Sequence, residues 1–147
     1  MVDGVWKIEM WGPYGWETVA TGILAEGRYL DASQRHWSQG TYSVDGDRIA
    51  IEAMTNVHTG EGHLFGRTDR HFNVHIKGTV SGPTITGEIK DTAMKFTVPM
   101  RMMRVSDLCT AVASGAKLSR PGPSVSRPLE IVRTCVAPAG TLEIRKG

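Results

Sequence analysis

Residues 40–51, GTYSVDGDRIAI, contain two runs of alternating apolar and polar residues on either side of Asp45-Gly46-Asp47. An Asp-Gly pair between two such runs is a strong short-range signal for a β-hairpin. Gly46 can adopt the positive φ that a primed turn requires, and Asp tolerates it better than most residues. The same order of short strand, turn and short strand recurs on both sides of this hairpin, which predicts an all-β chain.

The alternation predicts about eight strands in simple order, joined by short links apart from one long loop at 56–69. Val19 and Ile23 are the predicted inward residues of the second strand. Pro99 has no N–H to donate, which places the last strand at a sheet edge or at a bulge. The expected strands cover 5–10, 17–25, 28–31, 40–44, 48–55, 70–80, 84–90 and 94–103, with 32–39 polar and irregular.

The 147 residues include 17 glycines, which suits a chain with many reversals. Antiparallel neighbours joined in order either leave two exposed edges or close on themselves, and closure removes the edges. We therefore predict an eight-stranded antiparallel up-and-down barrel over residues 1–105. The interior of such a barrel either fills with side chains or leaves room for one small ligand.

Residues 106–147 form a C-terminal extension of different character. The first 105 residues hold 11 Lys/Arg and 12 Asp/Glu, whereas the extension holds 6 and 3. A nearly neutral body argues against nucleic acid as a partner. In the extension we expect a short helix within 106–118, a linker at 119–128 and two isolated strands at 129–136 and 141–145.

The lack of a recognisable targeting signal and the low number of cysteines favour a cytoplasmic protein. The N-terminal residues Met1 to Gly4 contain no basic segment followed by an apolar run, which argues against a signal peptide. No run approaches the roughly 18 apolar residues that span a bilayer, so we expect no membrane partner. We expect both thiols, Cys109 and Cys135, to be reduced.

Several short motifs occur in an order that resembles the GrlR-type proteins, small bacterial regulators named for a negative regulator of type III secretion genes. The resemblance covers roughly residues 3–104, and the order of the motifs carries it. The motifs are Asp3-Gly4-Val5-Trp6, Gly40-Thr41-Tyr42, Asp45-Gly46-Asp47, His58-Thr59-Gly60, Phe65-Gly66-Arg67 and residues 72–78.

The resemblance implies a lipocalin-like barrel, a homodimer, and regulation by contact with another protein. In the founding member, an acidic run at the tip of the hairpin holds a transcriptional activator. The matching positions here are Val44 to Asp47, where Asp45 and Asp47 are acidic, and these two are the candidate partner contacts.

An apolar stripe along three of the strands is predicted to line the barrel interior. A plain packed core is the favoured interpretation. Alternatives are a pocket for a small apolar ligand, since Met side chains adapt to varied shapes, and a dimer interface formed by some of the Met residues. Trp11, Tyr14 and Trp16 fit an interface or a pocket rim. The cavity candidates are Trp6, Ile8, Met10, Phe72, Val74, Ile76, Met94, Phe96, Val98 and Met100.

Metal binding and catalysis have little support in the sequence. His71 and His75 share a strand face but lie about 13 Å apart, too far for one ion. His58 and His63 could converge with His36, yet no carboxylate or thiol completes a known spacing. No nucleophile elbow, phosphate-binding loop or Cys–His pair occurs. We therefore expect no metal, no cofactor and no catalytic residue.

Three hypotheses follow for the function. The first is a non-enzymatic regulatory protein that acts as a dimer through protein contact. The second is an intracellular carrier or sensor of a small apolar molecule held in the barrel. A hydrolase or metalloenzyme ranks below both.

Overall fold

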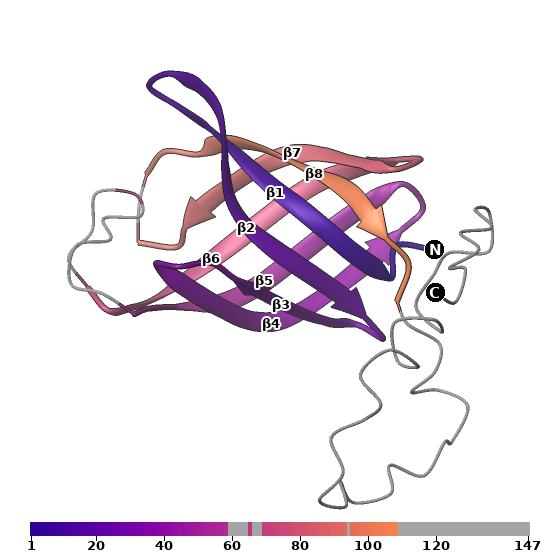
Figure 1. Cartoon of the computed structure of the whole chain (residues 1–147), viewed down its shortest axis with the longest axis horizontal. Helices are drawn as coiled ribbons and strands as arrows, with labels where there is room; N and C mark the ends of the chain where they lie inside the picture. The colour runs from indigo at the N-terminus through magenta and orange to yellow at the C-terminus, as the bar shows by residue number, and fades with distance from the viewer. Residues whose placement is uncertain (59–64, 66–68, 94, 109–147) are drawn as a thin grey trace, which may run out of the picture. The chain divides into compact units, whose positions relative to one another are not determined.

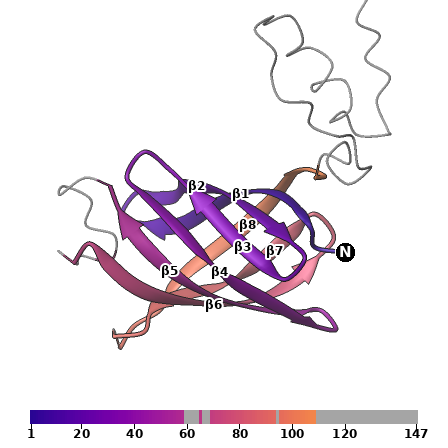
Figure 2. The same cartoon turned by 90° about the horizontal axis from the view of Figure 1, so that it is seen from below.

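Strands of alternating inward and outward residues make up the body of the chain, as the sequence predicts. The computed structural model describes residues 1–58, 65, 69–93 and 95–108. Within these residues, eight strands pair antiparallel in chain order and close into a barrel (Figures 1 and 2). The predicted fold class is confirmed. The strands are β1 (Gly4–Gly12), β2 (Gly15–Ala25), β3 (Arg28–Ala32), β4 (His36–Asp45), β5 (Arg48–Val57), β6 (His71–Ser81), β7 (Thr84–Asp91) and β8 (Val98–Ser106).

The hairpin predicted at residues 40–51 joins β4 to β5. Asp45 pairs with Arg48, which leaves Gly46 and Asp47 as a two-residue loop. Gly46 has a φ of 61°, and the φ of Asp47 is not positive. This combination suits a type II′ turn, in which the first central residue needs a positive φ. The predicted Asp-Gly turn is therefore confirmed.

Buried apolar side chains from every strand except β4 meet inside the barrel as one hydrophobic cluster, and the partly buried Tyr42 of β4 packs against it. The inward positions alternate along each strand with outward ones, as the period of two requires. Burial of these side chains is the main force that holds the barrel together. The buried apolar residues are Val2, Trp6, Ile8, Ala20, Leu24, Tyr29, Ile49, Ile51, Ala53, Phe72, Val74, Ile76, Ile85, Ile89, Met100 and Met102.

Charged side chains connect the last strand to the first. On the outer face, Arg101 Nε of β8 donates to Glu9 Oε2 of β1 at 2.5 Å, and Lys7 Nζ lies 2.9 Å from Glu9 Oε1. Hydrogen bonds from Lys7 and Arg101 lower the pKa of Glu9 below its ordinary value. The Arg101 guanidinium also lies 4.4 Å from the centre of the Trp16 ring. These contacts support the closure of the barrel between β8 and β1.

The predicted inward residues of the second strand are only partly correct. Ile8 of β1 pairs with Ala20 and Glu9 pairs with Thr18, so that Val19 is an extra residue in a β-bulge. A bulge shifts the alternation by one position. Beyond it, Ala20 and Leu24 are buried, whereas Ile23 faces outward and is 37% exposed. The prediction of Ile23 as an inward residue is therefore wrong, and Val19 is partly buried at the bulge.

The last strand begins later than predicted and is not at an edge. β8 starts at Val98, and Pro99 pairs in register with Glu88 of β7. A proline in the second position of a strand costs little pairing, which explains how Pro99 fits a closed sheet. Likewise, residues 36–39 belong to β4 and are not irregular as expected.

The chain divides into two units, residues 1–105 and 106–147. Of the second unit the structure describes only 106–108, so the helix, linker and strands expected further along, and both cysteines, lie outside the described residues. The described residues contain no helix that is long and apolar enough to span a membrane.

Candidate functional site

The predicted cavity residues mostly belong to the packed core. Six of the ten candidates (Trp6, Ile8, Phe72, Val74, Ile76 and Met100) are buried in the hydrophobic cluster. Met10 and Val98 are partly buried against it. Phe96 is 52% exposed, because it precedes β8 and does not take part in the alternation, so its assignment to the interior is wrong. Met94 lies outside the described residues.

The barrel interior also contains a cluster of polar side chains that the sequence analysis did not predict. We call Tyr29, Asp31, His36, Ser38 and Thr55 the interior polar cluster; all five are at most 7% exposed. Asp31 of β3 pairs with Ser38 of β4, which pairs with Thr55 of β5. The cluster therefore crosses three neighbouring strands on the inner face of the wall.

Hydrogen bonds connect most of the interior polar cluster. The Tyr29 hydroxyl donates to Asp31 Oδ2, and the Ser38 and Thr55 hydroxyls lie 3.0 Å apart. Asp31 Oδ1 has no hydrogen-bond partner among the described atoms, and His36 Nε2 lies 3.6 Å from it. Burial, together with the charge of Asp31 and its hydrogen bond, raises the pKa of Tyr29 well above its ordinary value. Tyr29 therefore stays protonated and remains a donor.

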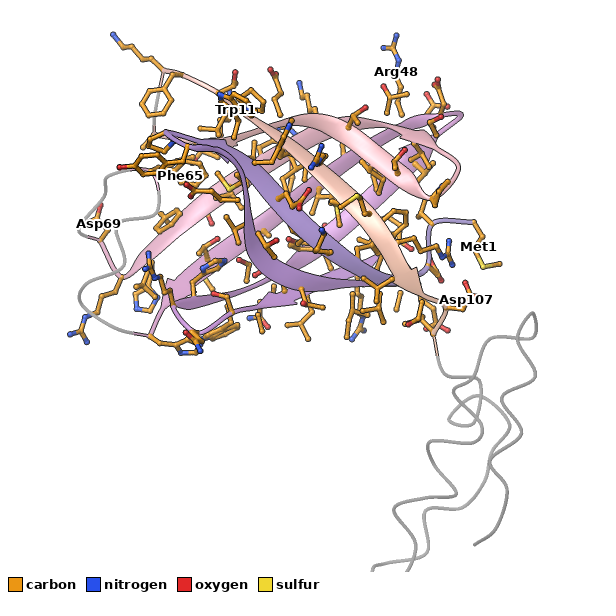
Figure 3. The ribbon with its side chains drawn as sticks, turned by 45° about the horizontal axis from the view of Figure 1, so that its top comes forward. Met1, Trp11, Arg48, Phe65, Asp69 and Asp107 are labelled. Carbon is orange, nitrogen blue, oxygen red and sulfur yellow. The ribbon has the colours of Figure 1, made fainter. Side chains whose placement is uncertain are left out.

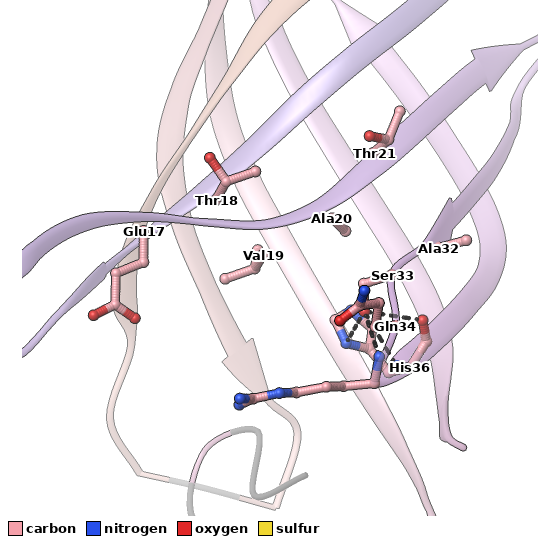
Figure 4. A pocket seen from close by; sticks show the side chains of 10 residues that line it. Glu17, Thr18, Val19, Ala20, Thr21, Ala32, Ser33, Gln34 and His36 are labelled. Atoms are coloured by element: carbon pink, nitrogen blue, oxygen red, sulfur yellow. Dashed lines mark hydrogen bonds between the residues drawn. The ribbon is translucent and has the colours of Figure 1, made fainter. Parts of the chain in front are cut away.

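A hollow of about 490 Å³ lies beside His36, between β2 and the β3–β4 turn (Figure 4). It exists because β3 ends at Ala32, opposite Thr21, so that the first half of β2 has no strand partner on this side. None of the predicted cavity residues that the structure describes lines it. Its walls carry hydroxyl, amide and small apolar groups, with one carboxylate, one guanidinium and one imidazole: Glu17, Thr18, Val19, Ala20, Thr21, Ala32, Ser33, Gln34, Arg35 and His36.

The His36 ring lies between the side chains of Ser33 and Asp31, as the histidine of a Ser-His-Asp catalytic triad does. Ser33 Oγ lies 3.0 Å from His36 Nδ1. However, Ser33 Oγ also accepts the backbone N–H groups of Arg35 and His36, each at 3.1 Å, which uses both of its lone pairs. Ser33 is thus a turn-forming hydroxyl, and we assign it no nucleophilic role.

Burial of His36 makes the stability of the fold depend on pH. Burial lowers the pKa of His36 below its ordinary value of 6.5, as does the charge of His58, while the charge of Asp31 partly opposes the shift. The unfolded chain therefore binds a proton at a higher pH than the folded chain, and stability decreases as the pH falls below about 6.5.

Urea unfolding at about pH 7.5 and about pH 5.5 checks this expectation. We expect the free energy of unfolding to decrease at the lower pH, and the decrease to be smaller in His36→Gln. Carboxylates other than Asp31 contribute to both proteins alike, so the difference between them reports on His36 and its interaction with Asp31. An equal decrease in both proteins would contradict the assignment.

The outer wall of the barrel differs in charge from one side to the other. Outward residues of β5–β8 include several charged side chains, among them Arg48, Lys77, Glu88 and Lys90. By contrast, one group of outward residues that are cross-strand neighbours on β1 to β5 carries no charge. We call this surface the uncharged face; it consists of Val5, Thr21, Ile23, Leu30, Ala32, Trp37, Gln39 and Met54.

Large apolar side chains lie side by side on the uncharged face. Ile23 pairs with Leu30, Leu30 with Gln39, and Gln39 with Met54, so these side chains form one row across the strands. Ile23, Leu30 and Met54 are 37%, 47% and 41% exposed. A row over these four strands, β2 to β5, is about 14 Å long. Charged residues, among them Lys7, Arg28 and Glu52, border the face.

Aromatic side chains project from the β1–β2 hairpin, which extends beyond the barrel wall (Figure 1). Tyr14 is 95% exposed, and the rings of Trp11 and Trp16 pack edge to face with their centres 5.4 Å apart. Trp11 and Phe65 lie at one end of the barrel, and Met1 lies at the other (Figure 3). These aromatic residues therefore lie at one end of the barrel and do not line the hollow beside His36, and the interface or pocket rim expected for them stays a prediction.

The remaining candidates are separated from one another. Asp45 and Asp47 are exposed at the end of the β4–β5 hairpin. His71 and His75 are on the outer face of β6, where His71 Nδ1 lies 2.6 Å from Asn56 Oδ1. Among the described residues, no group of three or more His, Cys, Asp or Glu side chains could hold a metal ion. His63 lies outside the described residues.

Comparisons with known proteins do not assign the chain to a family. No protein-family model matches it, and a search of curated proteins found no similar sequence. The resemblance to the GrlR-type proteins stays a prediction that depends on the motifs given above.

Proposed function

We propose that the protein is a non-enzymatic regulatory protein that forms a homodimer and acts through protein–protein contact. The uncharged face is the observation that carries this proposal. It places three exposed apolar side chains in one row, and no charged side chain lies among them. Protein interfaces have this arrangement, an uncharged centre with a polar border.

A second copy of the chain is the partner that suits the uncharged face. A two-fold axis places the same surface on both subunits, so residues near the axis meet their own copies. A charged side chain at that position would meet an identical charge, whereas Leu30 and Ile23 would meet apolar groups. The charged border would then form the rim of the interface.

The hairpin between β4 and β5 is the proposed contact for a further regulatory protein. Asp45 and Asp47 are exposed there, on the strand pair for which the GrlR-type resemblance implies partner binding. The alternative function, transport of an apolar ligand, has weaker support because most of the predicted cavity residues pack against one another in the core.

Leu30→Lys tests the dimer. We expect the unmodified chain to have about twice its monomer mass of 16.0 kDa in size-exclusion chromatography with light scattering. The variant places two like charges near the axis, and we expect its dimer dissociation constant to rise at least about tenfold. Leu30 is exposed in the monomer, so the barrel should still fold, which circular dichroism can verify.

Thr86→Lys is the matched control, because Thr86 is exposed on the outer face of β7, among charged residues. This variant should keep the dimer. A monomeric unmodified chain, or a Leu30→Lys protein that dimerises as tightly as the control, would contradict the proposed interface.

A further inference from the structure

The β3–β4 turn is held together by the side chains of Ser33 and His36. The Ser33 backbone N–H donates to the His36 carbonyl at 2.8 Å, and Ser33 Oγ accepts the backbone N–H groups of Arg35 and His36. The His36 ring then folds back on the turn, with Nδ1 at 3.0 Å from Ser33 Oγ (dashed lines in Figure 4). One hydroxyl therefore connects three residues of the turn, Ser33, Arg35 and His36.

The hydrogen bonds of this turn determine which nitrogen of the neutral His36 ring carries the proton. A serine hydroxyl has one proton and two lone pairs, and both lone pairs of Ser33 are used by backbone N–H groups. Its proton must therefore point to an acceptor. Two acceptors are within reach: His36 Nδ1 at 3.0 Å, and the His36 carbonyl at 3.3 Å, which has a second lone pair beside the one that accepts the Ser33 N–H. With either acceptor, Ser33 Oγ has no lone pair left to accept an Nδ1–H. Nδ1 is thus unprotonated, and the neutral ring carries its proton on Nε2, toward Asp31.

Protonation of His36 is incompatible with this pattern. An imidazolium ring donates from both nitrogens, so Nδ1–H would become a third donor to Ser33 Oγ, which has no free lone pair. The turn must then give up one of its bonds. At the same time the positive ring is attracted to Asp31 Oδ1, which lies 3.6 Å from Nε2 and has no hydrogen-bond partner among the described atoms. Both effects move the ring away from the turn.

The turn faces the hollow, and its Arg35 carbonyl also accepts the backbone N–H of His58 at 2.8 Å. Thr18, Val19 and Ala20 of β2 form the opposite wall, and this part of β2 makes no ladder with β3. The charged and titratable groups near His36 come from four segments. They are Asp31 and Tyr29 of β3, Glu17 of β2, Arg35 of the turn and His58 after β5.

We propose that His36 is a protonation switch for the β3–β4 turn. With His36 neutral, the turn is closed and forms one wall of the hollow. With His36 protonated, the ring pairs with Asp31, the turn loosens, and the hollow widens on the side of the interior polar cluster. The hollow thereby has a different shape and a different charge at low pH.

Nuclear magnetic resonance of the full chain tests the switch. Long-range ¹H–¹⁵N spectra at neutral pH should show His36 Nδ1 as the unprotonated nitrogen. During acidification, the backbone amide signals of Arg35 and His36 should shift with the same midpoint as the His36 ring. Below that midpoint, their protection against hydrogen exchange should fall by about tenfold after correction for intrinsic exchange.

Two variants and one control separate the switch from a general effect of acid. In Ser33→Ala the His36 ring should still titrate beside Asp31, but the Arg35 amide should no longer follow it. In His58→Gln the midpoint should move upward, because a neighbouring positive charge is removed, while the coupling of ring and amide remains. His75→Gln on the outer face of β6 should change neither signal.

Three results would overturn the proposal. The first is a His36 ring that carries its proton on Nδ1 at neutral pH. The second is an Arg35 amide signal that does not change while the ring titrates. The third is an amide response in Ser33→Ala equal to that of the unmodified chain.

Discussion

Gly40→Ala is expected to lower the free energy of unfolding by about 3 kcal/mol, because the new methyl group would overlap the backbone of the neighbouring strand. A Cβ atom at Gly40 would lie 1.9 Å from the Glu52 carbonyl oxygen and 2.6 Å from Ala53 Cα. Real Cβ atoms do not approach other atoms so closely, and a backbone carbonyl in a sheet cannot rotate away. β4 and β5 would have to separate, with loss of their pairing. Chemical denaturation measures the loss.

Gly22→Ala is the control for this prediction. Gly22 lies within β2, also on an inward position, but a Cβ there would meet Ile8 Cδ1 at 2.8 Å, the flexible end of a side chain. A change of the Ile8 rotamer relieves that contact, so we expect a clearly smaller loss of stability. A Gly40→Ala protein as stable as Gly22→Ala would show that β4 and β5 lie further apart than described.

The close approach at Gly40 also shows what the sequence could and could not predict. Alternation and the Asp-Gly turn are local signals, and they correctly predicted the number of strands, their order and the closed barrel, although not every strand boundary. Gly40 was part of the stretch that predicted the hairpin, but its role depends on the distance between two strands. That distance depends on how β4 and β5 pack within the closed barrel, and no short sequence pattern predicts it.

Errors in the prediction arose where one residue changed the phase of a strand. The extra residue at Val19 moves Ile23 from the predicted interior to the uncharged face. Phe96 lies two residues before Val98 and so has the same phase in the sequence as the inward residues of β8, yet the strand begins only at Val98. A bulge and a strand start are set by pairing with a neighbour, so the alternation alone does not locate them.

The interior polar cluster was missed for a different reason. Asp31 and Ser38 are polar residues in strands, and the usual position of such residues is the solvated face. Only the alternation with Leu30, which is exposed, would have indicated that Asp31 points inward. His36 was expected in the irregular segment 32–39, whereas it opens β4 and is buried. The candidate site therefore came mostly from the structure.

Tyr29→Phe is expected to destabilise the barrel by about 2–3 kcal/mol, because it removes a hydrogen-bond donor from a buried carboxylate. The Tyr29 hydroxyl donates to Asp31 Oδ2, and Asp31 Oδ1 has no hydrogen-bond partner among the described atoms. Without Tyr29, neither oxygen of Asp31 would have a described donor within hydrogen-bonding distance. Water cannot readily replace the hydroxyl, since Tyr29 and Asp31 are 2% and 7% exposed.

Tyr42→Phe is a control with the same chemistry in a wetter place. The Tyr42 hydroxyl donates to Asp3 Oδ1, but both residues are partly exposed, so water can take over the hydrogen bond. We expect this variant to lose less than about 1 kcal/mol. The double variant Tyr29→Phe/Asp31→Leu should recover part of the loss, because it removes the carboxylate that Tyr29→Phe leaves without a donor. Equal losses in Tyr29→Phe and Tyr42→Phe would mean that the carboxylate of Asp31 is hydrated, and the interior polar cluster would then be open to solvent.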